Sequence, residues 1–298
     1  MKILITGATG LVGTKLVRRL EDRGHFVSVL VRQQPQKKNE FYWNPAQNEI
    51  DKNAFSDIDA IIHLAGANIG KKWTKSHRKA IVSSRIETAD LVLNTCKALN
   101  TKLKCFISAG GINYYGTFSS DEVLTEETPI LHQDFLSSVC QQWENKADEF
   151  SSISERVVVL RTAPVLASKG GCLDNIKTIT DLHLSAGLGS GQQWFNWIHI
   201  DDLVEMYIFA LENKTVQGAI NAVADEIPTN QNFMKSVAKS RGKLFIPITI
   251  PAFLLRFALG EMSEILLEGT RISNKKIKSL GFDFKYKSLT DALQSVNE

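Results

Sequence analysis

Three glycines near the start of the chain have the spacing of a loop that binds phosphate groups. Gly7, Gly10 and Gly13 follow an apolar run at residues 2–6 and open a helical pattern. Glycine allows a tight strand-to-helix turn, a close approach of the backbone to a pyrophosphate, and close packing of the helix. The start of a helix adds free N–H groups and the positive end of its dipole. The alternative is that the loop is only a structural turn. We expect a dinucleotide pyrophosphate on the run Gly7, Ala8, Thr9, Gly10, Leu11, Val12 and Gly13.

The end of the second apolar run, residues 26–32, bears on which dinucleotide would bind. Proteins that bind NAD place an acidic side chain there, where it bonds the ribose 2′-hydroxyl. This chain has Arg32 and no acid close by, and a guanidinium suits the 2′-phosphate of NADP. The sequence therefore favours NADP(H) over NAD(H), the alternative being that Arg32 is only a solvated arginine at a strand end.

A few side chains further along could act on a substrate. Tyr114 and Tyr115 follow the fourth apolar run, and side chains at that end of a parallel sheet face the ligand crevice. Tyr115 is a candidate donor in a substrate pocket, or a packed tyrosine of its wall. His199, followed by Asp201 and Asp202, could act as an acid or base, or could fix the chain's return to the main domain.

An aromatic segment precedes this histidine. Trp194, Phe195 and Trp197 could stack on a flat or sugar-like ligand, or could cover a hydrophobic core. We place Trp194, Tyr115 and His199 in a candidate pocket for a small-molecule substrate.

Composition argues against several other functions. The 298 residues carry a formal net charge of +3, which gives no support for nucleic acid as a partner. The sequence has no apolar run near the roughly 18 residues that span a bilayer and no signal-peptide pattern, so we expect no membrane association and a cytoplasmic location. The four cysteines lack the spacing of metal ligands or of a disulfide framework, and no metal site is predicted.

The elements that must position these residues alternate between strands and helices. Five apolar runs lack the alternation of half-exposed strands, as strands buried on both faces do. They lie at residues 2–6, 26–32, 59–64, 104–108 and 157–161. Ala89, Val92, Leu93 and Cys96 form one stripe of a helix, and Asp134 is expected to cap another. This order predicts an α/β fold, a Rossmann-type doubly wound parallel sheet with a smaller C-terminal lobe.

The pattern changes after about Pro164, where glycine-rich loops and mixed short elements follow. We expect residues 1–165 to form the NADP-binding domain, with a return segment at about 196–224. Residues 166–298 would form the smaller substrate lobe. The oligomeric state stays open between monomer and homodimer.

Longer motifs resemble those of extended short-chain dehydrogenase/reductases. The glycine spacing is that of the epimerase-like members, and His63, Leu64, Ala65 and Gly66 resemble the turn that holds the adenosine side of the cofactor. Further motifs within residues 63–144 and 189–202 are similar to the uncharacterised, sugar-nucleotide-epimerase-like "epimerase family". Residues 259–262 and 281–284 are similar to that family's own C-terminal module. The resemblance covers essentially the whole chain. It implies the Rossmann fold, NADP(H), and a small-molecule substrate for which a sugar nucleotide is one candidate.

The same resemblance identifies what the chain lacks. Working extended reductases carry a Tyr-x-x-x-Lys pair on one helix face, where the lysine helps the tyrosine to transfer a proton. The matching positions hold Leu136 and Cys140, and Gly111 stands where a supporting hydroxyl belongs. The catalytic residues are therefore unassigned, with Tyr115, Ser108 and Cys140 as candidates.

The resemblance places the nicotinamide near Gly110, Cys140 and Pro164, with Ser108 also beside the cofactor. Two functions remain open. One is an NADP-dependent oxidoreductase or epimerase-like enzyme with a replaced proton donor. The other is a non-catalytic NADP(H)-dependent sensor or scaffold, which a retained phosphate loop and a missing catalytic pair would also fit.

Overall fold

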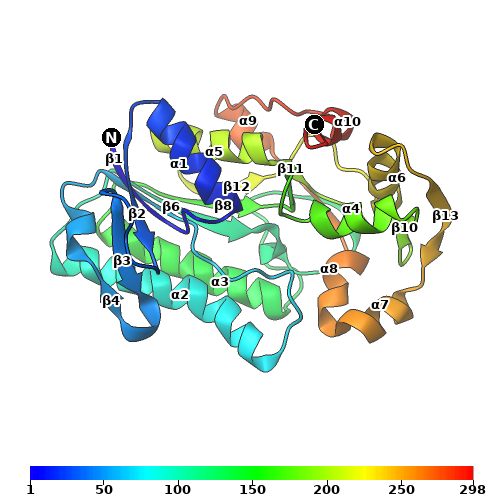
Figure 1. The fold of residues 1–298 in the computed structure, drawn as a ribbon, viewed down its shortest axis with the longest axis horizontal. Coiled ribbons are helices and arrows are strands. Elements are labelled where there is room, and N and C mark those ends of the chain that lie inside the picture. The colour runs from blue at the N-terminus through cyan, green and yellow to red at the C-terminus, as the bar shows by residue number, and fades with distance from the viewer. Residues whose placement is uncertain (298) are drawn as a thin grey trace. The chain divides into compact units, whose positions relative to one another are not determined.

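A computed structural model, which describes residues 1–297, shows an α/β protein built on one large sheet. The sheet has eight strands in the order β12-β8-β6-β5-β1-β2-β3-β4 (Figure 1). They are β1 (Lys2–Thr6), β2 (Phe26–Val31), β3 (Glu40–Asn44), β4 (Glu49–Ile50), β5 (Ala60–His63), β6 (Cys105–Gly111), β8 (Val157–Thr162) and β12 (Gly218–Ala222). All five predicted strands are present, and the doubly wound α/β fold is confirmed.

The strand β1 lies inside the sheet and is buried on both faces. Ile3, Leu4 and Ile5 are completely buried, as expected for a strand covered by helices on both sides. β1 pairs in parallel with β2 on one side and with β5 on the other. The chain continues outward in parallel to β3 and to β6, and β4 is antiparallel to its neighbour β3. The strand order thus reverses at β1, and sheets of this kind bind ligands at the carboxyl ends of the strands there.

Helices cover both faces of this sheet (Figure 1). α1 (Leu11–Asp22) and α5 (Ile200–Glu212) lie on one face, and α2 (Lys75–Ala98) and α3 (Phe135–Asp148) lie on the other. The predicted apolar stripe of α2, residues 89–96, is buried against the sheet in one hydrophobic cluster. Asp134 caps α3 as predicted, since its Oδ1 accepts a 2.9 Å hydrogen bond from the Ser137 backbone N–H.

The residues group into two compact units, each assembled from separate segments. The first unit comprises residues 1–111, 138–161 and 204–220. The second comprises residues 112–137, 162–203 and the chain from residue 221 onward. Residues 112–137 thus group with the second unit, although they precede the boundary expected near residue 165.

One partly buried arginine holds the last segment of the first unit in place. The guanidinium of Arg156 donates hydrogen bonds to the carbonyls of Ala210 (3.1 Å), Leu211 (3.1 Å) and Val216 (2.6 Å). Three carbonyls at and beyond the end of α5 are satisfied in this way, as helix C-termini require.

The second unit contains three two-stranded parallel sheets and the shorter helices. Its strands are β7 (Ser120–Leu124), β9 (Val165–Leu166), β10 (Ser185–Leu188), β11 (Ile198–His199), β13 (Phe245–Ile250) and β14 (Thr270–Ile272). Its helices are α4 (Leu173–Asp181), α6 (Asn230–Ser240), α7 (Ala252–Leu259), α8 (Glu264–Leu267), α9 (Lys275–Ser279) and α10 (Leu289–Ser295). Trp197, Phe233 and Leu289 are among the residues at its hydrophobic centre. Across residues 1–297, no helix combines the length and the apolar character that crossing a membrane requires.

Candidate functional site

The glycine loop connects β1 to α1 in the first unit, and two of its glycines are required by the packing of the chain itself. Gly7 has a φ of +72°, and a Cβ there would lie 2.7 Å from the carbonyl carbon of Leu64. A Cβ on Gly13 would lie 2.3 Å from the Gly7 oxygen. Gly10 is less confined, since its nearest neighbour would be the Gly7 oxygen at 3.3 Å. Internal packing therefore explains Gly7 and Gly13 better than it explains Gly10, where a closely approaching ligand would account for the missing side chain.

The first turn of α1 has the features of an anion site. Its N-cap residue is Gly10, no side chain caps it, and no acidic residue stands in the first turn. Thr9, Gly10 and Leu11 are exposed. The first N–H groups of a helix have no partner within the helix, and here no carboxylate occupies them. This arrangement fits a pyrophosphate.

Behind the loop, His63 is a buried part of the framework. It is completely buried; its Nδ1 lies 2.9 Å from Thr6 Oγ1 and its Nε2 lies 3.2 Å from Thr88 Oγ1. Burial lowers the pKa of His63 from 6.5 to about 4, so the ring is neutral near pH 7. Thr88 donates its own proton to the Ser84 carbonyl at 2.7 Å, which makes the Nε2–H tautomer the consistent one.

Through this neutral ring, the end of β1 is joined to the turn that follows β5. Thr6 Oγ1 donates to His63 and also accepts a 3.2 Å hydrogen bond from the Ala65 backbone N–H. Leu64 in turn lies against Gly7. His63 therefore positions the predicted turn of residues 63–66 and, being wholly buried, would not touch a cofactor itself.

Arg32 follows the last residue of β2 and is exposed. Within residues 1–297 its guanidinium has no hydrogen bond or ion pair to another side chain. A charged group with this freedom at the end of the second strand is suited to the 2′-phosphate of NADP.

A second arginine of the first unit, Arg85 on α2, received no role from the sequence reasoning. It is 9% exposed and donates to the carbonyls of Ile81 (2.9 Å) and Ala67 (3.2 Å). Its Cζ lies 4.7 Å from the centre of the Trp143 ring. Burial lowers the pKa of Arg85, and an electrostatic interaction with Cys140 acts in the opposite direction. The sequence around Arg85 does not distinguish it from a surface arginine, because the turn and the α3 residues that enclose it come from distant parts of the chain.

The positions of the missing catalytic pair are apolar and covered. Leu136 is 4% exposed and Cys140 is 6% exposed. Ser108, near the end of β6, is 1% exposed, and its hydroxyl donates to the Ala109 carbonyl at 2.9 Å. Gly110 has no room for a side chain, since a Cβ would lie 2.7 Å from Val159 Cγ1.

In the second unit, Tyr115 is completely buried and is held by a polar network. Its phenol donates a 2.8 Å hydrogen bond to Asn221 Oδ1. The same asparagine donates from its backbone to Glu126 Oε1 at 2.8 Å and from Nδ2 to the Ser273 carbonyl at 3.1 Å. Burial raises the pKa of Glu126. The network joins chain segments far apart in the sequence, as a packed wall tyrosine would.

His199 is also held inside the second unit. It is 3% exposed and packs against Tyr286 with the two rings tilted, their centres 3.7 Å apart. Its Nδ1 accepts from the Asp201 backbone N–H at 3.1 Å, and its Nε2 lies 2.9 Å from Ser295 Oγ. Next to it, the carboxylate of Asp202 accepts hydrogen bonds from two backbone N–H groups near residue 285. The environment of His199 is that of a structural histidine.

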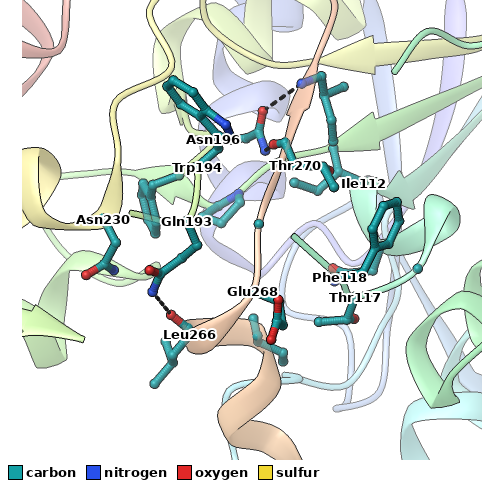
Figure 2. A pocket seen from close by; sticks show the side chains of 17 residues that line it. Ile112, Thr117, Phe118, Gln193, Trp194, Asn196, Asn230, Leu266, Glu268 and Thr270 are labelled. Carbon is teal, nitrogen blue, oxygen red and sulfur yellow. Dashed lines mark hydrogen bonds between the residues drawn. The ribbon is translucent and has the colours of Figure 1, made fainter. Parts of the chain in front are cut away.

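A pocket of about 590 Å³, counting its opening to solvent, lies within the second unit (Figure 2). Of the predicted residues, Trp194, Phe195 and Pro164 line it, whereas Tyr115 and His199 do not. Trp194 is held by a 2.8 Å hydrogen bond from its Nε1 to Asp121. The rest of the lining comes from residues that were not predicted as site residues: Ile112, Asn113, Gly116, Thr117, Phe118, Gln193, Asn196, Asn230, Ile265, Leu266, Glu268, Gly269, Thr270 and Ile272.

The aromatic segment therefore divides between two roles. Phe195 lines the pocket and stacks on Phe233 with ring centres 3.9 Å apart, while Trp197 is completely buried in the core. Among the described residues, no group of three or more His, Cys, Asp or Glu side chains is arranged to hold a metal ion.

Comparison with known proteins gives matches at both ends of the chain. Residues 3–135 match the NAD dependent epimerase/dehydratase family, and residues 250–296 match a domain of unknown function, DUF1731. An epimerase family protein of Staphylococcus aureus (strain MRSA252) is 34% identical to this chain and covers 98% of it and 98% of its own length.

Solved structures give the same result. A human epimerase family protein crystallised with NADPH superposes with a TM-score of 0.87 at 28% identity, over 100% of this chain and 99% of that one. A UDP-glucuronic acid 4-epimerase from Bacillus cereus, in complex with UDP-glucuronic acid and NAD, gives a TM-score of 0.79 at 19% identity over 100% and 98% of the two chains. At that identity the likeness shows the fold alone.

Proposed function

Because the chain belongs to the epimerase family, we propose that it binds NADP(H) and acts as an oxidoreductase or epimerase-like enzyme on a small molecule. The observation that carries the proposal is the glycine loop of the first unit. Its α1 N-terminus is uncapped and exposed, and Gly7 and Gly13 hold the loop in place.

The preference for NADP(H) rests on Arg32. Its exposed guanidinium would bond the 2′-phosphate, and the uncapped N–H groups of α1 would bond the pyrophosphate. The turn of residues 63–66, fixed by His63, would support the adenosine side. The human relative was solved with NADPH, which agrees with this preference.

The cofactor, once bound, supplies or accepts a hydride. This chain would have to provide the proton from a group other than the usual tyrosine. Ser108, Tyr115 and Cys140 remain the candidates, although Ser108 and Tyr115 are engaged in internal hydrogen bonds. Trp194 would line the substrate site. A sugar nucleotide is one candidate substrate, because the Bacillus cereus protein was solved with one.

The cofactor assignment can be tested by calorimetric titration with NADPH, NADP, NADH and NAD. Loss of one charge-assisted contact of about 1.5–3 kcal/mol should make Arg32→Ala bind NADPH roughly ten to a hundred times more weakly, with NADH binding unchanged. Arg18→Ala, which removes another exposed arginine of the first unit, is the matched control and should bind both as the wild type does. An Arg32→Ala protein that keeps its preference for NADPH would contradict the assignment.

A second function, a non-catalytic NADP(H)-dependent sensor or scaffold, is favoured by one observation. Leu136 and Cys140, at the positions of the usual pair, are both buried. Adding carbonyl substrates to the NADPH complex while following nicotinamide absorbance separates the two functions. Oxidation that is lost in Cys140→Ser or Tyr115→Phe, with NADPH binding unchanged, supports the enzyme. Tight binding without turnover, together with cofactor-dependent capture of a partner protein, supports the sensor.

A further inference from the structure

The pocket of the second unit has an unusual charge for a site that would hold a sugar nucleotide. Among its 17 lining residues, Glu268 is the only one with a charged side chain, and none is a lysine, arginine or histidine. Arg271 lies nearby, but its guanidinium stacks over the Trp194 ring, 5.0 Å from the ring centre. The lining therefore presents one negative charge and no positive charge.

The carboxylate of Glu268 is held in place through one of its two oxygens, and the other accepts no hydrogen bond within residues 1–297. Its Oε2 accepts a short hydrogen bond from the Ser119 hydroxyl, and the same hydroxyl accepts one from the Gly269 backbone N–H at 3.2 Å. In residues 1–297 neither a hydrogen bond to Oε1 nor an ion pair to this side chain is formed. Figure 2 shows Glu268 among the side chains that line the pocket. A ligand that brings a donor would find an oriented acceptor.

Backbone N–H groups could replace arginine as a phosphate site, but those at the start of α6 and at Thr117 are already used. The helix α6 begins at the pocket with Asn230, whose N–H donates to the Gln193 carbonyl at 2.8 Å. The next two N–H groups donate to the Gly191 carbonyl (2.9 Å) and to the N-cap hydroxyl of Thr229 (3.3 Å). The Thr117 N–H, on the other side, donates to the Asp134 carboxylate at 2.6 Å.

The remaining polar side chains are neutral, and four of them fall into two groups. The side-chain amides of Gln193 and Asn196 already donate to backbone carbonyls, those of Leu266 (2.7 Å) and Thr270 (2.7 Å), respectively. The amide of Asn113 and the hydroxyl of Thr117 make no side-chain hydrogen bond within the described chain, and both line the pocket. Such groups can bond hydroxyls and amines, but they carry no positive charge to balance the negative charge of a diphosphate.

We propose that this pocket binds a phosphate-free ligand whose hydroxyl or amine groups donate to Glu268, in place of the sugar nucleotide suggested by the family resemblance. The inference rests on the proposed function only in taking this pocket as the substrate site. A diphosphate would bring two negative charges to a lining whose one charge is also negative, and like charges in a partly desolvated site repel strongly. A hydroxyl bonds the carboxylate directly, and an ammonium also neutralises it.

The test is saturation-transfer NMR on the full chain loaded with NADPH, with glucose, glucosamine and UDP-glucose as separate probes. The wild type should give signals from glucose and stronger ones from glucosamine, and none from UDP-glucose. Glu268→Gln should weaken glucosamine binding about tenfold or more, because it removes a charge-assisted hydrogen bond. Glu268→Lys should gain binding of UDP-glucose. Glu122→Gln, an exposed acid of the same unit outside the pocket, is the matched control.

The outcomes separate this inference from the cofactor proposal. Wild-type protein that binds UDP-glucose more tightly than glucosamine, or that binds neither sugar, would overturn it, as would unchanged glucosamine binding in Glu268→Gln. NADPH titration of the same proteins reports on the first unit alone. Absence of NADPH binding would refute the proposed function, whatever the sugar probes show.

Discussion

The neutral histidine behind the glycine loop makes a measurable prediction about pH. His63 has an ordinary pKa of 6.5 when the chain is unfolded and of about 4 when it is buried in the fold. Between these values the unfolded chain takes up a proton that the folded protein does not, so stability is complete above pH 6.5 and falls as the pH is lowered. Proton linkage with these two values gives a loss of about 2 kcal/mol between pH 7 and pH 5.

The variant His63→Asn isolates this contribution, because a carboxamide keeps one donor and one acceptor for its two threonine partners but does not titrate. The free energy of unfolding would be measured by urea titration of both proteins at pH 7 and pH 5. The other five histidines and the carboxylates are shared, so they cancel in the comparison. We expect the wild type to lose about 2 kcal/mol more than the variant on acidification.

If the two proteins lose the same stability between pH 7 and pH 5, within about 0.5 kcal/mol, the His63 ring is not held neutral by the fold. A lowering of its pKa to about 4 would then be excluded. A lower stability of His63→Asn at pH 7 alone would not bear on the argument, because it reports only on packing.

Three further variants test the framework of the two units. Gly7→Ala should destabilise the protein by more than the roughly 1–2 kcal/mol of left-handed strain, and should abolish NADPH binding. The control is Gly24→Ala, at a similar φ of +78° with nothing within 4 Å of its Cβ. In thermal unfolding it should show the cost of the strain alone. Glu144→Ala should lower the free energy of unfolding by about 3–5 kcal/mol, because it removes the carboxylate that pairs with the buried guanidinium of Arg161 through two 2.8 Å hydrogen bonds. A loss under about 1 kcal/mol in urea unfolding would contradict a stabilising buried pair. Tyr115→Phe should lower the free energy of unfolding by about 1–2 kcal/mol, because the Asn221 amide oxygen loses its donor. NADPH affinity in calorimetry should be unchanged. Full stability with abolished turnover would instead show that the Tyr115 phenol is catalytic.

The fold and the family were predictable because their signals are local. A buried strand, a glycine turn and an amphipathic helix follow one another within residues 2–22, and the structure reproduces them as β1, the loop and α1. The predicted resemblance to the epimerase family, including its C-terminal module, is confirmed by the relatives and by the match at residues 250–296. Each of these features lies within one continuous stretch of sequence, so periodicity and spacing are enough to predict it.

The pocket was much less predictable, because its wall is assembled from distant segments. Asn113, Gln193 and Glu268 line it together, yet each is an ordinary polar residue in its own sequence neighbourhood. Tyr115 and His199 were selected for their chemistry, but side-chain type does not reveal that both are enclosed by partners from beyond residue 220. The assignment of cofactor and catalytic residues, including Arg32 and Ser108, stays a prediction.

The three hydrogen bonds from Arg156 to the chain near residues 210–216 have a consequence for how the protein is made. When a ribosome has released residues up to 165, this guanidinium lacks these three acceptors and the sheet lacks β12 at its edge. The first unit is closed only when a segment made about fifty residues later returns to it. An expression fragment cut at the compositional boundary would thus omit part of the unit it was meant to isolate. Fragments of this protein have to be designed from the interleaving of its segments.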